Sequence, residues 1–192
     1  MSTPLLTDRF IQALCWAAEL HREQIRKGSG IPYVGHLLGV ASLALDYGAD
    51  EDEAIAALLH DAIEDQGGAA TREEIRRRFG DRVTAIVDGC TDAEVIPKPP
   101  WRERKEAHLQ HLRVASPSER LVSAADKLHN ALAILRDYRT KGEPVWERFR
   151  GGKEGTLWYL RALVATFDEV GPAALAAELR RTVAEIDALA AR

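Results

Sequence analysis

The 192-residue sequence holds only two cysteines, Cys15 and Cys90, which are too few for a disulfide framework. Both fall in apolar helical surroundings, where a free thiol packs as a small hydrophobic group. The first twenty residues lack an uninterrupted apolar segment and include Asp8, Arg9 and Glu19, so they do not resemble a signal peptide. From these absences we expect a reducing, cytoplasmic location.

The sequence also lacks long hydrophobic runs and an excess of positive charge. Its longest stretch without a formal charge, residues 28–45, is interrupted by glycine, proline, serine and histidine, which makes it a poor membrane span. The net charge is −4, so no basic surface for nucleic acid is expected. Any phosphate group must therefore bind in a local pocket. We expect neither a membrane nor a nucleic acid partner, and nothing in the sequence indicates an oligomeric state.

Polar and apolar residues do not alternate as they do in strands, and no internal repeat or linker is present. Hydrophobic residues make up 46% of the chain and charged residues 29%, values that are ordinary for a globular protein with a full core. Apolar residues instead recur at spacings of three and four, the period of an α-helix. The sequence therefore predicts an all-α fold, a single compact multi-helix bundle over residues 1–192.

Capping residues and helix breakers divide the chain into predicted helices. Thr7 or Asp8 caps the first helix, Thr71 and Glu74 have the spacing of a capping box, and Ser116 precedes a proline at a helix start. We expect helices over roughly residues 7–27, 33–48, 50–66, 71–80, 81–87, 101–112, 116–135, 153–170 and 172–190. A loop is expected at residues 91–100, because its three prolines break any helix.

Residues 58–65, Leu-Leu-His-Asp-Ala-Ile-Glu-Asp, run from a buried helix face into a cluster of polar groups. His60 and Asp61 are adjacent, and Glu64 and Asp65 each lie four residues, about one helical turn, beyond one of them. Three carboxylates so close together repel one another unless a cation is near. The pattern indicates a site for binding metal or moving protons. The alternative is a polar helix end exposed to water.

Two further ligand-type residues lie far away along the chain. His36 falls in the first turn of the predicted second helix, and Asp126 falls inside an apolar stripe, where a buried carboxylate needs a cation or several donors. With His60 and Asp61 they make a set of four ligands from three helices. Mixed nitrogen and oxygen ligands suit Mn²⁺, Fe²⁺ or Zn²⁺ rather than Cu(I). On a six-coordinate ion, four protein ligands leave room for water and a phosphate oxygen.

Taken together, these residues resemble the HD-domain metal-dependent phosphohydrolases, and more closely the alarmone hydrolases within that family. The resemblance covers about residues 13–138, and the predicted helices of residues 139–192 lie beyond it. It rests on ordered segments at family-like separations, which are residues 21–27 (HREQIRK), 32–36 (PYVGH), 58–65 (LLHDAIED), 79–80 (FG) and 125–130 (ADKLHN). A lone His-Asp pair is common by chance, whereas the ordered set is specific.

The resemblance implies a role for each matched residue. One divalent ion, usually Mn²⁺ with Fe²⁺, Zn²⁺ or Ni²⁺ as alternatives, is bound by the residues that match His36, His60, Asp61 and Asp126. The residues that match Glu64 and Asp65 position or deprotonate the attacking water, and those that match Arg26, Lys27 and Asn130 contact the nucleotide. Carboxylates one turn from the ion suit proton transfer, and adjacent cations suit a polyphosphate. Alternatively, Arg26 and Lys27 are only the cationic last turn of the first helix.

The sequence departs from the alarmone-hydrolase pattern at Leu132 and Ala133, where polar residues near the nucleotide are typical of the family. This departure concerns the substrate and leaves the metal ligands untouched. Residues 150–159 form a glycine-flanked basic turn entering an aromatic helix, in which Lys153 and the helix N-terminus are expected to contact phosphate. The alternative is a flexible loop between helices, with Trp158 and Tyr159 as core residues.

The leading functional hypothesis is a metal-dependent guanosine-3′,5′-bis(diphosphate) 3′-pyrophosphohydrolase that releases pyrophosphate from a small-molecule nucleotide. One alternative keeps the mechanism and acts on a nucleoside monophosphate or another phosphate ester. Another is a non-catalytic nucleotide-binding sensor. Glu64 and Asp65 argue against the sensor, because a protein that only binds does not need carboxylates beside the ion.

Overall fold

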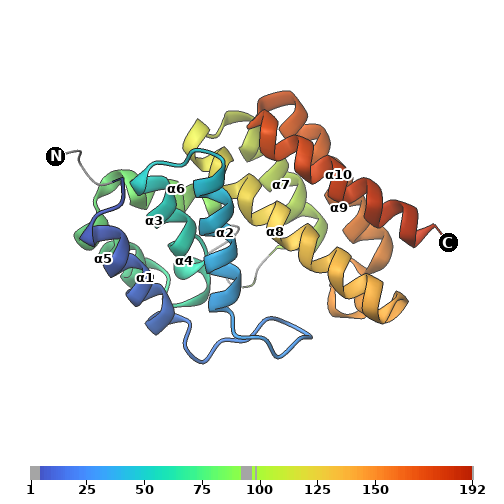
Figure 1. Cartoon of the computed structure of the whole chain (residues 1–192), viewed down its shortest axis with the longest axis horizontal. Helices are drawn as coiled ribbons and strands as arrows, with labels where there is room; N and C mark the ends of the chain where they lie inside the picture. The colour runs from blue at the N-terminus through green and yellow to red at the C-terminus, as the bar shows by residue number, and fades with distance from the viewer. Residues whose placement is uncertain (1–4, 92–96, 98, 192) are drawn as a thin grey trace.

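Residues 5–91, 97 and 99–191 are described by a computed structural model of the chain, and they fold into an all-α bundle, as the sequence predicts (Figure 1). The predicted loop at 91–100 lies largely outside the described residues. The helices are α1 (Asp8–Leu20), α2 (Val34–Asp46), α3 (Glu51–Leu59), α4 (Ala62–Asp65), α5 (Ala69–Phe79), α6 (Asp81–Cys90), α7 (Trp101–Val114), α8 (Pro117–Lys141), the 3₁₀ helix η1 (Glu143–Arg148), α9 (Gly152–Val170) and α10 (Ala173–Ala190).

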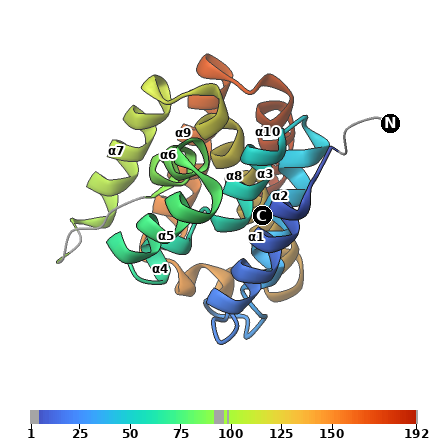
Figure 2. The ribbon, with the colours of Figure 1, turned by 90° about the vertical axis from the view of Figure 1, so that its left-hand side faces the viewer.

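Helix α8 runs through the bundle and packs against α2, α3, α6 and α10 (Figure 1). Buried apolar side chains from α1 through α10 form one cluster around it. Helices α2 and α3 also pack on each other, so the three helices that carry the predicted metal ligands meet in the centre. Helix α7 lies at the edge of the molecule and packs against α9 (Figure 2).

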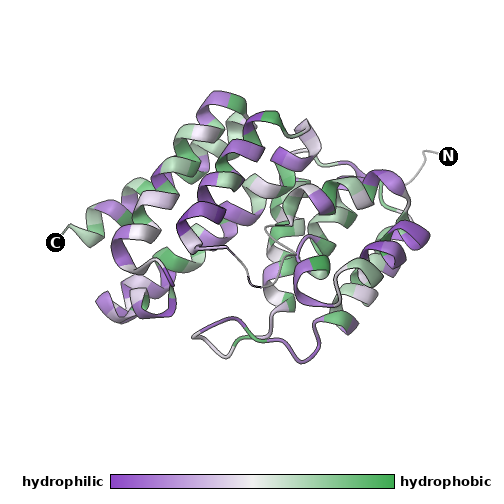
Figure 3. Cartoon of the chain, turned by 180° about the vertical axis from the view of Figure 1, so that it is seen from behind, coloured by the Kyte–Doolittle hydropathy of each residue, from purple (hydrophilic) through white to green (hydrophobic). Residues whose placement is uncertain are grey.

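Polar and apolar residues share most helices, with one face of each buried in the cluster (Figure 3). The cap predictions at Thr7 and Ser116 are confirmed: the Thr7 hydroxyl accepts from the Arg9 N–H, and Ser116 forms a capping box with Glu119. Among the described residues, no helix is long and apolar enough to cross a membrane.

The first helix is shorter than predicted, because it ends at Leu20 rather than at Lys27. Residues 21–33 form a loop that folds back on itself, with the Arg26 N–H donating to the Ile31 carbonyl over 2.8 Å. Gly28 and Gly30 have φ angles of 72° and 68°, which allow the turn between the paired segments. Arg26 and Lys27 are therefore loop residues, and the alternative that they form the last turn of a helix is wrong.

The single helix predicted over residues 50–66 is interrupted at His60 and Asp61, so that α3 ends at Leu59 and α4 begins at Ala62. The His60 side chain donates from Nδ1 to the Ala57 carbonyl over 2.9 Å and competes for a helical acceptor. Adjacent side chains diverge by about 100° on a regular helix. The interruption lets His60 and Asp61 face the same point.

One smaller expectation fails at α5, and one short helix of the structure was not predicted. Thr71 is not a cap: α5 begins at Ala69 after Gly68, whose φ of 61° favours glycine, and the Thr71 hydroxyl donates to the Gln66 carbonyl over 2.8 Å. The 3₁₀ helix η1 between α8 and α9 was also not predicted. The segment is too short to show a helical period, and its proline and tryptophan do not indicate a helix.

Asp50 caps α3 and provides a first prediction, about stability. Its carboxylate accepts from the Glu53 N–H at 3.0 Å and lies 2.7 Å from Arg82. Replacing Asp50 with alanine is expected to lower the free energy of unfolding by about 1 kcal/mol, as loss of an N-cap does. Chemical denaturation at pH 7 measures the change. The exposed Asp46, at the end of α2, is the matched control, and Asp46→Ala should change stability by less than about 0.5 kcal/mol.

The pH dependence of this difference follows from the pKa of Asp50. Slight burial alone would raise that pKa, but the bonds from Glu53 and Arg82 lower it below its ordinary 3.8. Because the folded-state pKa is depressed, the stabilisation is complete above 3.8 and is lost as pH falls through the folded-state value. The gap between wild type and Asp50→Ala should therefore shrink below pH 3.8, and a constant gap would contradict the assignment.

Candidate metal centre

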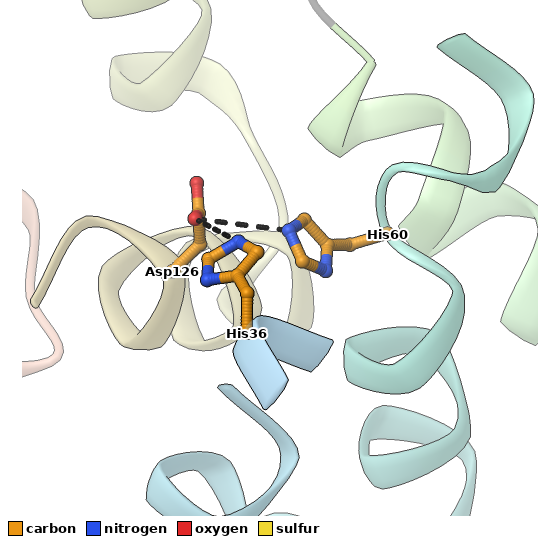
Figure 4. A group of neighbouring side chains, drawn as sticks. All are labelled: His36, His60 and Asp126. Atoms are coloured by element: carbon orange, nitrogen blue, oxygen red, sulfur yellow. Dashed lines mark ion pairs between the residues drawn. The ribbon is translucent and has the colours of Figure 1, made fainter. Parts of the chain in front are cut away.

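Three of the predicted ligands meet in the middle of the bundle. His36 comes from the first turn of α2, His60 from the end of α3 and Asp126 from α8, and all three are buried (Figure 4). One ligand atom from each lies within 4.8 Å of the others. Asp126 Oδ1 is 3.2 Å from His36 Nε2 and 3.7 Å from His60 Nε2. Residues separated by up to ninety positions in sequence thus share one centre.

Asp61, the fourth predicted ligand, faces the same point from the start of α4. Its Oδ2 lies 3.0 Å from His60 Nε2 and 3.8 Å from His36 Nε2. The Tyr33 hydroxyl donates a short hydrogen bond to this oxygen. Both carboxylates therefore lie beside both imidazoles, and the fold brings the four side chains close together.

The hydrogen bond at the back of His60 fixes which nitrogen faces the centre. Since the Ala57 carbonyl can only accept, Nδ1 of His60 carries the proton that bonds to it. Nε2 is fully buried and makes no hydrogen bond, although it is 3.0 Å from Asp61 Oδ2. A buried ring nitrogen without a partner, aimed at two carboxylates, fits a divalent cation bound between them.

Charges within the centre also favour a cation. Burial alone would lower the pKa of His60, but Asp61 and Asp126 raise it well above its ordinary value. Burial alone would raise the pKa of Asp126, but Lys127 and the two imidazoles hold it well below its usual range. Burial alone would likewise raise the pKa of Asp61, but His60 holds it below its usual range, so both carboxylates are ionised and stabilise positive charge where the ring nitrogens converge. A divalent ion supplies that charge.

Each carboxylate oxygen of Asp126 also accepts a hydrogen bond from a neighbour on α8. Lys127 Nζ donates to Oδ2 and Asn130 Nδ2 donates to Oδ1, both over 2.6 Å. The Asn130 amide oxygen accepts in turn from Arg26 over 2.8 Å. The donors required for a buried carboxylate are present, and they link α8 to the loop of residues 21–33.

The candidate water-activating carboxylates lie beside the centre on α4. Gln24 donates to Asp65 Oδ2 over 2.7 Å and accepts from Gln66 over 2.6 Å. Burial and the carboxylates of Asp61 and Glu64 raise the pKa of Asp65, although Gln24 lowers it. Like charges close together make Asp65 a better proton acceptor than an isolated aspartate. Glu64 lines the space directly in front of the metal centre.

Two adjoining cavities open onto the centre, with volumes of about 350 and 680 Å³. Both are lined by Lys27, Tyr33, Asp61, Glu64, Asn130, Arg148 and Phe149. The smaller adds apolar side chains such as Ile25 and Ile134, and the larger adds cations of α7 and Arg150. Together they form a cleft with acidic groups at its middle and basic groups around it. Such a cleft suits a phosphorylated small molecule larger than a single phosphate.

Lys153 is not brought to this cleft. Its ammonium donates to Glu143 over 2.7 Å and to the Ala190 carbonyl over 2.9 Å, and it lines neither cavity. The prediction that it contacts phosphate is therefore not supported, because these partners hold it at the end of α10. Arg150, from the same predicted turn, does line the larger cavity.

Leu132 and Ala133 have different surroundings. Leu132 is 42% exposed and lines neither cavity, whereas Ala133 is buried and lines the smaller one. The sequence departure at Leu132 thus lies outside the cleft. Ala133 and the adjacent Ile134 make one part of the wall of the smaller cavity apolar.

Sequence reasoning missed several residues around the centre. Tyr33, Gln24 and Lys127 bond directly to Asp61, Asp65 and Asp126. Arg148 lines both cavities and pairs with Asp137 at 2.5 Å. Tyr33 and Gln24 lie within the segments that carry the family resemblance, and that position could have identified them as site residues. Arg148 lies in the unpredicted η1 and had none.

Comparisons with known proteins show which family this chain belongs to. A family model described as an HD domain matches residues 13–157. A relative from Xenopus tropicalis, guanosine-3′,5′-bis(diphosphate) 3′-pyrophosphohydrolase MESH1, is 39% identical over 143 residues, which cover 73% of this chain and 75% of that protein. The human protein of that name is 35% identical over 145 residues, which cover 74% of this chain and 76% of its own length.

Solved structures show the same architecture. One, described as a metazoan ortholog of SpoT that hydrolyzes ppGpp, superposes with a TM-score of 0.76 at 26% identity, covering 95% of this chain and 96% of that chain. A second, lmo0812 from Listeria monocytogenes EGD-e, gives a TM-score of 0.68 at 30% identity, covering 79% of this chain and 97% of its own.

Proposed function

The chain belongs to the HD domain family, and from that premise we propose that it is a guanosine-3′,5′-bis(diphosphate) 3′-pyrophosphohydrolase. The observation that carries the proposal is the buried, unpartnered Nε2 of His60 facing Asp61 and Asp126 beside a cleft rimmed with cations. Relatives that align with most of this chain are named for that activity. The metal ligands proposed are His36, His60, Asp61 and Asp126.

Mn²⁺ is the proposed ion, with Fe²⁺, Zn²⁺ or Ni²⁺ as alternatives, because two imidazoles and two carboxylates suit a borderline or hard divalent metal. When bound, such an ion lowers the pKa of water and offsets charge on a phosphate group. Second-layer bonds hold the ligands in place: Asn130 and Lys127 on Asp126, and Tyr33 on Asp61.

The chain's own residues would divide the rest of the work. Glu64 and Asp65 accept the proton of the attacking water, whose oxygen bonds to the phosphorus attached to the ribose 3′ oxygen. The bond from that phosphorus to the 3′ oxygen breaks, pyrophosphate leaves, and the 3′ oxygen takes up a proton. Lys27 and Arg148 line both cavities and face the charge of the phosphates. Arg26, in the smaller cavity, is the proposed nucleotide contact.

The proposal is tested with purified protein, Mn²⁺ and guanosine tetraphosphate beside a panel of nucleoside monophosphates. Pyrophosphate and orthophosphate are measured separately. We expect pyrophosphate and GDP in equal amounts from the tetraphosphate, and no turnover after chelation. Orthophosphate from the monophosphates would instead favour the alternative substrate class. Binding of nucleotide without product would favour a sensor and contradict the proposal.

A further inference from the structure

His129 lies behind one metal ligand and has no role in the proposed reaction. Its Nδ1 is 2.9 Å from Nδ1 of His36, on the side of that ring opposite Asp126. His129 lies three residues after Asp126 on α8, a spacing at which its ring could have faced that carboxylate. The structure places it against His36 instead.

Gly39 makes this placement possible. It lies on α2, three residues after His36, and the ring of His129 occupies the space that a side chain there would need. A Cβ at position 39 would lie 2.3 Å from both Cδ2 and Nε2 of His129, a distance that real Cβ atoms do not adopt. The notch in α2 is thus filled by the imidazole from α8.

Arg26 determines which of the two histidines carries the proton shared between their Nδ1 atoms. Its NH1 lies 3.3 Å from Nδ1 of His129, and an arginine can only donate. Nδ1 of His129 must then be an acceptor, so the proton between the rings sits on Nδ1 of His36. That leaves Nε2 of His36 with its lone pair facing Asp126, the form in which an imidazole binds a metal.

We infer that His129 is a positioning residue that fixes the orientation and tautomer of His36 for metal binding, and that Arg26 fixes the tautomer of His129. Arg26 also donates to Asn130, which donates to Asp126. One guanidinium therefore bonds both to His129, the neighbour of the ligand His36, and to Asn130, the neighbour of the ligand Asp126. The inference rests on the proposed metal site but not on the identity of the substrate.

The test measures the Mn²⁺ dissociation constant without nucleotide, from the electron paramagnetic resonance signal of free Mn²⁺. His129→Phe keeps an aromatic ring and removes the acceptor, and Mn²⁺ binding should weaken by about 10- to 100-fold, as for lost outer-shell partners of other metal sites. His129→Gln restores an acceptor and should recover most of the affinity. Leu132→Ala, an exposed neighbour one turn away, should bind like wild type.

Gly39→Ala provides a second route that removes no polar group. It should displace the His129 ring and weaken Mn²⁺ binding by about 10- to 100-fold. If His129→Phe does not fold, this variant tests the inference in its place. Nitrogen-15 spectra of the Zn²⁺-bound protein should show His36 protonated on Nδ1 and His129 on Nε2. A foldable His129→Phe or Gly39→Ala variant with an affinity within about twofold of wild type overturns the inference, as do reversed tautomers.

Failure of the proposed function has a different signature. If the protein binds Mn²⁺ but releases no pyrophosphate, the proposed function fails while the affinity ratios still decide the role of His129. If wild type binds none of Mn²⁺, Fe²⁺, Zn²⁺ and Ni²⁺, both are overturned.

Discussion

Replacing Asp126 with alanine is expected to remove both the bound metal and the activity. Asp126 Oδ1 is the oxygen nearest to both imidazoles, 3.2 Å from His36 and 3.7 Å from His60. Without it, two ring nitrogens and Asp61 remain, with one negative charge fewer to bind a divalent ion. We expect turnover to fall by roughly a thousandfold or more, since each 1.4 kcal/mol lost from the transition state costs tenfold in rate. Metal content after gel filtration and pyrophosphate release measure the two effects.

Folding must be controlled in this experiment, because Asp126 also accepts from Lys127, whose side chain is only 18% exposed. Alanine leaves that ammonium without its partner, so a loss of roughly 2–3 kcal/mol in stability is expected. Asp126→Asn keeps the shape and one acceptor oxygen, and it should lose metal with a smaller loss of stability. Asp168→Asn removes a carboxylate from an exposed ion pair with Arg180, outside the centre, and should keep both metal and turnover. An active, metal-containing Asp126→Ala protein would contradict the ligand assignment.

The elements that could be predicted from sequence are those whose signals are local. The caps at Thr7 and Ser116 and the regular apolar period of α8 identified helices that the structure contains. The interruption at His60 could not be predicted in this way, since residues 50–66 carry a continuous helical pattern. It depends on a side-chain bond to the Ala57 carbonyl, made by a residue that helix propensity treats as ordinary.

The same distinction applies to the centre. Residue type and the order of the matched segments predicted a set of four ligands. The structure groups His36, His60 and Asp126, with Asp61 beside the two imidazoles. Position alone could not show that Lys153 bonds to the Ala190 carbonyl, because that contact depends on how α10 returns to α9. Nor could it show that the loop of residues 21–33 bonds to Asp61, Asp65 and Asn130 through Tyr33, Gln24 and Arg26. Long-range side-chain pairing of this kind requires the tertiary arrangement.

Glu64→Gln is expected to separate metal binding from chemistry. Glu64 lines both cavities in front of the centre and is not one of the four proposed ligands. Glutamine has nearly the same shape and cannot accept the proton of the attacking water, so turnover should fall by about 10²- to 10⁴-fold. The Mn²⁺ affinity should stay within about twofold of wild type, because no ligand is lost. Steady-state pyrophosphate release and the Mn²⁺ titration give the two quantities.

The matched control for Glu64 is Glu73→Gln on α5, which removes a carboxylate from an exposed pair with Arg76 and should leave both quantities unchanged. The two variants should differ in metal binding: Asp126→Ala should lose metal and turnover together, whereas Glu64→Gln should lose turnover alone. If Glu64→Gln kept most of its turnover, Asp65 would be the remaining proton acceptor, and its carboxylate is already held toward the cleft by Gln24. If Glu64→Gln lost its metal, Glu64 would be a ligand, and the division between metal-binding and proton-accepting carboxylates proposed for residues 60–65 would be wrong.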